Sequence, residues 1–422
     1  MADLISLSTQ IVDEGAPIFP VRVNQELSEI ADGVAVVESF SNAIALRTED
    51  GLIVSDTSGA RTGEEVVQRL REWSQEAFHT ILYTHGHLDH VGGAAAFVAN
   101  AGDLGHPAPR FVGHENLPRR FDRYNLTAGY NSIVNRRQFG GAPKMSIGGS
   151  ERFLPRGTPA PDVTFGDRLG LGVGGVRMDL RHAKGETDDH LWVWLPERKM
   201  ILTGDLFMWN FPNAGNPQKV QRYPREWAAA LREMSGMEAE LLVPAHGFPV
   251  GGADRIRMIL DDTASALETL LKGTLEMMNA GERLDSILHS LKLPAEVMAK
   301  PYLRAVYDEP EFIIHNIWRL YGGWYDGNPS RLKPASDAAL AAEVASLSGG
   351  VDALVTRAEA LAQVEEFRLA CHLIEMAVLA EPENRKAHGA RAEIYARRRD
   401  REGSLMSRGI FGAAASESQE KV

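Results

Sequence analysis

The 422-residue chain contains a single cysteine, Cys371, and this scarcity excludes two kinds of chemistry. A disulfide cannot form within one chain, and a zinc site built on several thiolates is not available. Cys371 stands in the helical pattern Leu369–Leu373, which favours a small core residue over a nucleophile. The fold must therefore be held by an apolar core, for which 44% apolar residues are ample.

Basic runs and long apolar runs are also missing. The net charge of −12 argues against nucleic acid as a partner, because neutralising phosphates requires clustered cations. No stretch approaches the roughly 20 apolar residues of a membrane helix. The start, Met1–Ser8, lacks both the basic and the apolar segment of a signal peptide. We therefore expect a cytoplasmic protein that binds neither nucleic acid nor a membrane.

One dense cluster of metal-binding side chains is present, directly after the apolar run Ile81–Tyr83. Within six positions stand His85, His87, Asp89 and His90. Imidazole nitrogens and a carboxylate together suit zinc, manganese or iron. Alternate residues that leave a strand can direct two ligands to one ion, while the next pair turns toward a second ion. The cluster therefore predicts a metal site at the end of a strand, with a solvated polar loop as the alternative.

Strand and helix patterns alternate around this cluster. We expect strands at Val34–Val37, Ala43–Arg47, Gly51–Val54 and His79–Tyr83, with a helix at Glu64–Ala77 and another that begins at Val91–Phe97. After Gly251–Asp254 the strand patterns stop and helical spacing takes over. The helices expected there are Arg255–Asn279, Leu284–Leu291, Glu311–Tyr321, Ala338–Leu347, Val351–Gln363, Phe367–Ala380 and Arg385–Arg398. The patterns predict an α/β region followed by an all-α region.

Three further candidate ligands stand later in the chain, close to strand-like runs. Asp205 follows Met200–Gly204, His246 follows Leu241–Ala245, and Glu186 lies in a turn. Each of them alone could be an ordinary polar residue at the end of a strand. Taken in this order together with the first cluster, they predict a metal centre assembled from separate segments.

The form His-x-His-x-Asp-His at residues 85–90 resembles the signature of the metallo-β-lactamase superfamily. This resemblance implies an α/β fold, the αββα sandwich, and a binuclear metal centre. By resemblance, His85, His87 and Glu186 would hold one ion, Asp89, His90 and His246 would hold the other, and Asp205 would bridge them. Two Zn²⁺ ions, with Mn²⁺ or Fe²⁺ as alternatives, would activate a water for hydrolysis, so Asp89 and Asp205 are also expected to be catalytic.

Two features resemble the alkylsulfatase group of that superfamily. Glu186 stands where a histidine ligand is usual, and Trp324–Pro329 is similar to the Trp-Tyr-Asp-Gly-Asn-Pro signature of the group's helical dimerisation domain. The resemblance implies cleavage of an alkyl or aryl sulfate ester, a small-molecule substrate, by a homodimer. The implied parts are a catalytic domain over residues 1–252, a helical dimerisation domain over 253–404 and a tail over 405–422, which we expect to be frayed from 413 on.

Substrate-binding residues are expected first in the loop-rich segment Gly113–Pro161, which should cover the metals. Its arginines carry donors that recognise tetrahedral oxyanions, although a solvated basic face would look the same. Asn131 with Arg136 and Arg137 resembles a stretch of the alkylsulfatases. The Thr-Leu-Arg-Gly sulfate contact of the group is missing after the bridging aspartate, so Arg222 or the paired arginines are expected to replace it.

The C-terminal helices supply two more candidates. By resemblance, His315 would be the general acid that protonates the departing alkoxide, and Tyr325 would contact the substrate. A histidine beside Ile313, Ile314 and Ile317 could equally be a satisfied core residue.

Other functions stay open. The same site could act on a lactone or on a carboxylic, thio- or phosphate ester. A mononuclear iron oxygenase of sulfur compounds would use the same fold. A non-catalytic dimeric binding protein is the third alternative, and the complete set of seven ligand-type residues argues against it.

Overall fold

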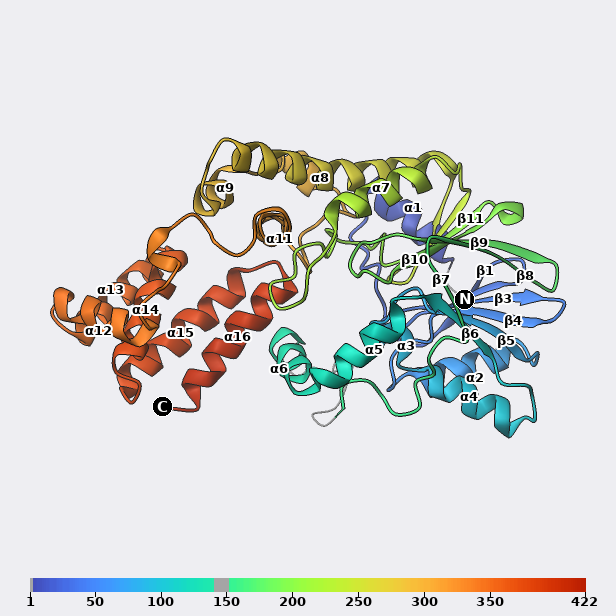
Figure 1. Cartoon of the computed structure of the whole chain (residues 1–422), viewed down its shortest axis with the longest axis horizontal. Coiled ribbons are helices and arrows are strands. Elements are labelled where there is room, and N and C mark those ends of the chain that lie inside the picture. The colour runs from blue at the N-terminus through green and yellow to red at the C-terminus, as the bar shows by residue number, and fades with distance from the viewer. Residues whose placement is uncertain (1–2, 140–151) are drawn as a thin grey trace. The chain divides into compact units, whose positions relative to one another are not determined.

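The computed structural model describes residues 3–139 and 152–422 (Figure 1). These residues form two compact units, one of residues 1–133 and 144–323 and the other of residues 134–143 and 324–422. Both sheets belong to the first unit, and the second unit is helical. The predicted fold class, an αββα sandwich followed by an all-α region, is confirmed.

Seven strands of the described chain form the first sheet, in the order of the sequence. They are β1 (Leu27–Ala31), β2 (Val34–Val37), β3 (Ala43–Thr48), β4 (Gly51–Ser55), β5 (Phe78–Leu82), β6 (Arg110–His114) and β7 (Val163–Phe165). The pairs from β1 to β4 are antiparallel, and those from β4 to β7 are parallel. The ends of β4, β5 and β6 therefore meet at one edge of the sheet.

The second sheet has six described strands in the order β13-β12-β11-β10-β9-β8. They are β8 (Arg168–Val173), β9 (Val176–His182), β10 (Leu191–Leu195), β11 (Met200–Gly204), β12 (Leu241–Pro244) and β13 (Val250–Gly251). Because β11 and β12 run parallel, the residues after them, Asp205 and His246, leave the sheet at the same edge.

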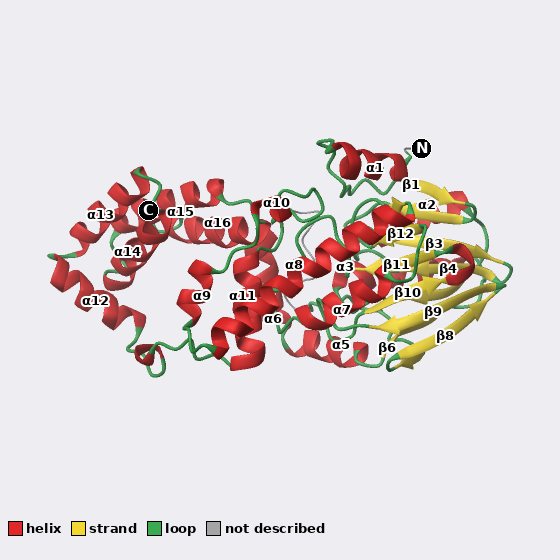
Figure 2. Ribbon diagram, turned by 90° about the horizontal axis from the view of Figure 1, so that it is seen from above, coloured by secondary structure: helices red, strands yellow, loops and turns green. Residues whose placement is uncertain are grey.

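Alternation along the strands explains the layers. In β2 and β4, Val34, Val36 and Ile53 face residues of the second sheet such as Leu180 and Leu202, and form the core between the sheets. Their neighbours on the opposite face of the first sheet pack against α2 (Gly63–Trp73) and α4 (Ala94–Asp103). Helices α7 (Pro224–Ser235) and α8 (Ala253–Asn279) cover the second sheet with α1 (Leu4–Glu14) (Figure 2).

Helices α8, α9 (Leu284–Ser290), α10 (Ala295–Met298) and α11 (Pro310–Gly322) belong to the first unit. Their apolar residues, among them Ile259, Ile287 and Ile317, join the core that covers the second sheet. The predicted dimerisation domain begins earlier, at residue 253. The compact unit that contains both sheets extends to residue 323.

The expectation that residues 113–161 are loop-rich is wrong for much of the segment. The structure has helix α5 (Leu117–Leu126) and helix α6 (Ala128–Phe139) there, while residues 140–151 lie outside the described chain. In α5 the residues Leu117, Phe121 and Tyr124 are buried in the core under the first sheet. Their helical spacing was obscured in the sequence by the intervening arginines.

The second unit is built on α12 (Asp337–Ser348), α13 (Val351–Gln363), α14 (Phe367–Ala380), α15 (Arg385–Arg401) and α16 (Leu405–Gln419). Residues 405–422, predicted as a tail that frays from residue 413 on, form α16 as far as Gln419 and pack on α15, so the predicted fraying is wrong. Ala415 is buried, and Ser418 accepts hydrogen bonds from Arg391 (2.9 Å) and pairs with His388 Nδ1 (3.0 Å). Within the described chain no single helix is long and apolar enough to cross a membrane, and only α12 and α13 together, bent by 88°, reach that length and composition.

Candidate metal centre

The predicted metal-binding motif leaves β5 and turns into the short helix α3 (Leu88–Val91). His85 and His87 lie in the turn, with His87 in extended conformation just before the helix, while Asp89 and His90 belong to α3. The first pair therefore points one way and the second pair another. This division produces two groups of ligands, as the spacing predicts.

The first group, the first cluster, consists of His85, His87, Glu186 and Asp205. His85 Nε2 lies 2.8 Å from His87 Nδ1 and 3.6 Å from Asp205 Oδ2. His87 Nδ1 lies 3.6 Å from Glu186 Oε1. Two imidazole nitrogens and two carboxylates thus converge from three segments onto a volume that suits one divalent ion.

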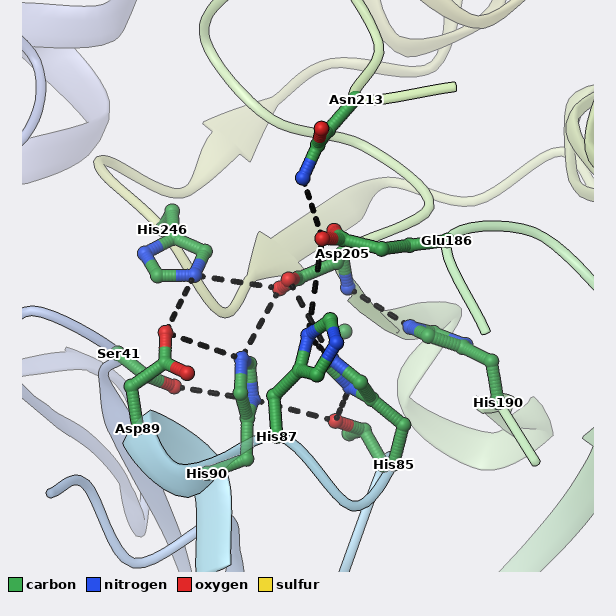
Figure 3. Close-up of polar contacts among 12 residues, drawn as sticks. Ser41, His85, His87, Asp89, His90, Glu186, His190, Asp205, Asn213 and His246 are labelled. Atoms are coloured by element: carbon green, nitrogen blue, oxygen red, sulfur yellow. Dashed lines mark hydrogen bonds and ion pairs between the residues drawn. The ribbon is translucent and has the colours of Figure 1, made fainter. Parts of the chain in front are cut away.

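The second cluster consists of Asp89, His90 and His246. His246 Nε2 lies 3.4 Å from Asp89 Oδ2, and His90 Nε2 lies 3.5 Å from the same oxygen. Asp205 Oδ1 lies 3.4 Å from both of these histidine nitrogens, while its Oδ2 faces His85. Asp205 therefore stands between the clusters with one oxygen toward each, as a bridging ligand requires (Figure 3).

Buried atoms without partners show that these residues fit metal ions. His90 Nε2 and Asp205 Oδ1 are buried, and neither has a hydrogen-bond partner. A buried polar atom left unpaired is costly, and a divalent ion would satisfy both of these atoms. The seven predicted ligands all lie in the two clusters, in the arrangement that the sequence predicts.

The electrostatics of the two clusters differ. Burial, together with the neighbouring His90 and His87, holds the pKa of His85 well below its usual range. Burial alone would lower the pKa of His246, but Asp205 and Asp89 raise this pKa to about 10. The first cluster therefore holds neutral imidazoles, which are ready to bind a metal, whereas an ion must displace a proton from the second.

Asp56 fixes the orientation of His90. Its Oδ2 lies 2.8 Å from His90 Nδ1 and accepts the hydroxyl of Thr84 at 2.8 Å, while its Oδ1 accepts the Thr84 amide at 2.9 Å. Asp56 itself has a positive φ of 61°, at the turn that ends β4. Because Nδ1 donates to this carboxylate, Nε2 is left as the acceptor that faces the second cluster.

The buried ion pair of Asp189 with Arg120 holds the turn at residues 85–87 in place. Asp189 Oδ2 accepts the Gly86 amide at 2.9 Å, and Asp189 Oδ1 accepts Arg120 Nε at 2.7 Å. A side chain at residue 86 would lie 2.7 Å from Arg120 Cδ, so glycine is required there. The next residue, His190, also supports the centre, because its Nε2 accepts the amide of Asp205 at 3.0 Å.

Glu186 is held by a loop that runs from Asn213 to Arg222. Asn213 Nδ2 donates to Glu186 Oε1, and Arg222 Nη1 lies 2.8 Å from the same oxygen. The middle of the loop is fixed by Asp308, whose Oδ2 accepts the Gly215 amide at 2.7 Å. Burial raises the pKa of Glu186 to about 7 even though Arg222 lowers it.

Of the predicted substrate-binding residues, Arg222 forms an ion pair with a predicted metal ligand, Glu186. The side-chain amide of Asn131 donates to Thr127, the residue just before helix α6, to its carbonyl at 3.1 Å and to its hydroxyl at 2.7 Å. Arg136, Arg137 and Tyr325 belong to the second unit. Their roles in substrate binding stay predictions.

His315 lies on α11, where its side chain is exposed. The next residue, Asn316, is buried and binds Arg222. The general-acid role of His315 stays a prediction.

Sequence reasoning missed Lys219, which lies in the loop between Asn213 and Arg222. Burial and Arg222 lower the pKa of this amine to about 8, while Glu186 and Asp89 act in the opposite direction. The pKa of Lys219 is therefore affected electrostatically by one carboxylate from each cluster. A lone lysine in an irregular segment has no sequence pattern that could have revealed this.

Comparison with known families agrees with this geometry. Residues 36–246, half of the chain, match the family described as the metallo-beta-lactamase superfamily. The chain belongs to this superfamily. Residues 283–421 match the family described as alkyl sulfatase dimerisation. This second match begins within the first compact unit, at the start of α9.

Individual members of the superfamily are similar over most of this chain. A linear primary-alkylsulfatase from Pseudomonas sp. (strain ATCC 19151) is 25% identical over 374 residues, which cover 83% of this chain and 69% of the relative. The alkyl/aryl-sulfatase BDS1 of Saccharomyces cerevisiae is 25% identical over 382 residues, which cover 86% of this chain and 59% of the relative. The chain thus spans between 59% and 69% of the length of these two relatives.

A solved structure shows the same fold. The stereoselective inverting sec-alkylsulfatase Pisa1 from Pseudomonas sp. superposes with a TM-score of 0.83 at 22% identity. The match covers 94% of this chain and 66% of that chain.

Proposed function

We propose that this superfamily member is a binuclear metal-dependent hydrolase that cleaves an alkyl or aryl sulfate ester. The observation that carries the proposal is Asp205, which stands between two buried clusters with one carboxylate oxygen toward each. The similarity to alkylsulfatases supports a sulfate ester as the substrate class.

The side chains divide the work in this proposal. His85, His87 and Glu186 would hold one ion, Asp89, His90 and His246 the other, and Asp205 both, with zinc as the expected metal. When bound, two such ions activate water at neutral pH and neutralise charge on the ester. Asp56 keeps His90 in the tautomer that this requires, and Asp189 keeps the His85–His87 turn in place.

Lys219 is the cation that we assign to the anionic head of the substrate. Glu186 and Asp89, one carboxylate of each cluster, both act to raise its pKa. Arg222 and Arg120, the buried guanidinium groups nearby, already pair with Glu186 and with Asp189. Lysine binds an oxyanion as a point charge, without the paired donors of arginine, so the head group would be held with less geometric selectivity.

A homodimer is the assembly that the match of residues 283–421 to the dimerisation family supports. We place its interface in the helical second unit and the adjoining α9 to α11. Measurement of the mass in solution tests this part of the proposal separately from the chemistry.

Metal content together with an ester panel tests the function. Elemental analysis of the purified protein should give two zinc ions per chain, and turnover should be found with alkyl or aryl sulfates. One iron per chain with oxygen consumption would contradict the proposal in favour of an oxygenase. Turnover of lactones, phosphates or carboxylic esters without any sulfate ester would leave the metal centre standing and overturn the substrate.

A matched pair of variants links the activity to the centre. Asp205→Asn removes the charge of the bridging residue, whereas Asp285→Asn makes the same change on the exposed face of α9. Only the first variant should lose metal and turnover.

A further inference from the structure

The carboxylate of Glu186 forms an ion pair with the guanidinium of Arg222. Arg222 Nη1 lies 2.8 Å from Glu186 Oε1 and also donates to the backbone carbonyl of Glu186, while Asn213 donates to the same Oε1. Arg222 is 1% exposed and Glu186 is 4% exposed. Water and salt screen a buried pair weakly, so the guanidinium offsets much of the charge that Glu186 would present to an ion.

The fold dedicates Arg222 to this contact. Its backbone amide donates to Asn316 Oδ1 at 3.1 Å, and Asn316 Nδ2 donates to its carbonyl at 3.0 Å, so α11 fixes the residue from both sides. Among the described residues, Glu186 is the carboxylate that forms an ion pair with Arg222. The Nε of Arg222 is buried and has no hydrogen-bond partner. The guanidinium therefore acts on Glu186 rather than on a more distant acid.

The other two carboxylates of the centre are built differently. The ion-pair partners that the structure records for Asp89 are His90 and His246, and those of Asp205 are His85, His90 and His246, all of them candidate ligands themselves. An imidazole that binds an ion is neutral, so these carboxylates keep their full charge toward the metals. Among the ion pairs recorded for these three carboxylates, only that of Glu186 with Arg222 has a cation from outside the ligand set.

We propose that Glu186 and Arg222 act together as a single ligand of nearly zero net charge, which replaces a neutral imidazole at the first cluster. Arg222 is then a positioning and charge-balancing residue for the first ion, and not a contact for the substrate. This inference rests on the metal centre of the proposed function. Its consequence is that the first ion keeps the Lewis acidity of a histidine-rich site and is held less tightly than a lone carboxylate would hold it.

Exchange of one or both partners tests the proposal, with metal content and metal affinity as readouts. Glu186→His leaves the Arg222 charge buried, unpaired and close to a divalent ion, so the first ion should bind about 10–100-fold more weakly. Addition of Arg222→Met removes that charge and should restore two ions per chain. Addition of Arg232→Met, an arginine that pairs with Asp261 and Glu268 on the surface, is the matched control and should restore nothing.

The single variant Arg222→Met gives the opposite sign. Glu186 then presents its full charge, and the first ion should bind at least tenfold more tightly in a competition with a chelator. A purely structural role of Arg222 would instead loosen the ion in this variant and leave the double variant no better than Glu186→His; either result overturns the proposal. If Arg222→Met does not fold, the pair Glu186→His and Glu186→His/Arg222→Met decides alone. A wild-type protein without metal would contradict the proposed function itself, which separates the two failures.

Discussion

The two ligand clusters are supported from outside by groups of opposite charge. In the second cluster a carboxylate, Asp56, binds the far nitrogen of His90 and makes that imidazole a stronger donor. In the first cluster a guanidinium, Arg222, binds Glu186 and makes that carboxylate a weaker one. Each cluster has two imidazoles, one carboxylate of its own and a share of Asp205, so the outer partners give different total charges to two ligand sets of equal charge. Residues outside the ligand set therefore have to be included before the properties of such a centre are judged.

Loss of the residue that both clusters share should have the largest effect. Asp205→Asn removes the one negative charge that both ions would share, so both ions should be lost. Turnover should fall by more than the roughly 10–100-fold that loss of an outer partner costs. Elemental analysis and an ester assay measure this. Retention of full activity would show that Asp205 does not bridge.

Proton release should distinguish the clusters next. Asp205 and Asp89 raise the pKa of His246 to about 10, so its imidazole is protonated at pH 8 without metal, and an ion must displace that proton. The affinity of the second cluster should rise about tenfold per pH unit for each proton released, up to about pH 10. His85 and His87 have pKa values well below their usual range because of burial, so the first cluster should release none at pH 8. Calorimetry of zinc binding in two buffers of different ionisation enthalpy counts these protons; equal release from both sites would contradict the difference.

The charge of Asp56, which holds the imidazole of His90, can be removed without a change in any metal ligand. Asp56→Asn keeps the shape but loses the charge that fixes the tautomer of His90, so the second cluster should bind its ion about 10–100-fold more weakly. The first cluster should change much less, since no ligand of it contacts Asp56 among the described residues. Competition with a chelator of known affinity gives both constants. Equal losses at the two clusters would mean that Asp56 holds the fold and not one ligand.

The smallest expected effect belongs to Lys219. Lys219→Ala should raise KM for an aryl sulfate about tenfold, because one half-buried charge contributes about 1 kcal/mol to binding. Metal content should not change. KM for a neutral aryl ester should stay within twofold. Arg225→Ala, in which a nearby positive charge on α7 is removed, serves as the control. An equal rise for neutral and anionic esters would exclude charge recognition by Lys219.

Short-range patterns predicted the strands and the group His85 to His90, and Asp205 and His246 each follow a buried strand. The assignment of these residues and of Glu186 to two ions came from the resemblance to the metallo-β-lactamase superfamily, and the structure brings all seven into two clusters. The partners of these ligands could not be predicted in the same way. Asp56 lies 34 residues from His90, and Arg222 lies 36 residues from Glu186, and neither contact leaves a pattern in the chain.

Two errors have a similar origin. Helix α5 has an apolar face made by Leu117, Phe121 and Tyr124, but the arginines between them hide this spacing in the sequence, and α16 is composed mostly of small and polar residues without a strong apolar face. In both cases packing against a neighbouring element decides the structure, and propensity does not.

The loop between Asn213 and Arg222 has both of its ends on one side chain, Glu186. The exposed or half-buried residues Pro217–Val220 between these anchors can be exchanged, or a few added, at a small entropic cost while the metal ligand stays fixed. Selection can therefore alter what reaches the ions without altering the ions. In such an arrangement a new substrate is acquired by changing a few residues of one loop, and the reaction chemistry is inherited intact.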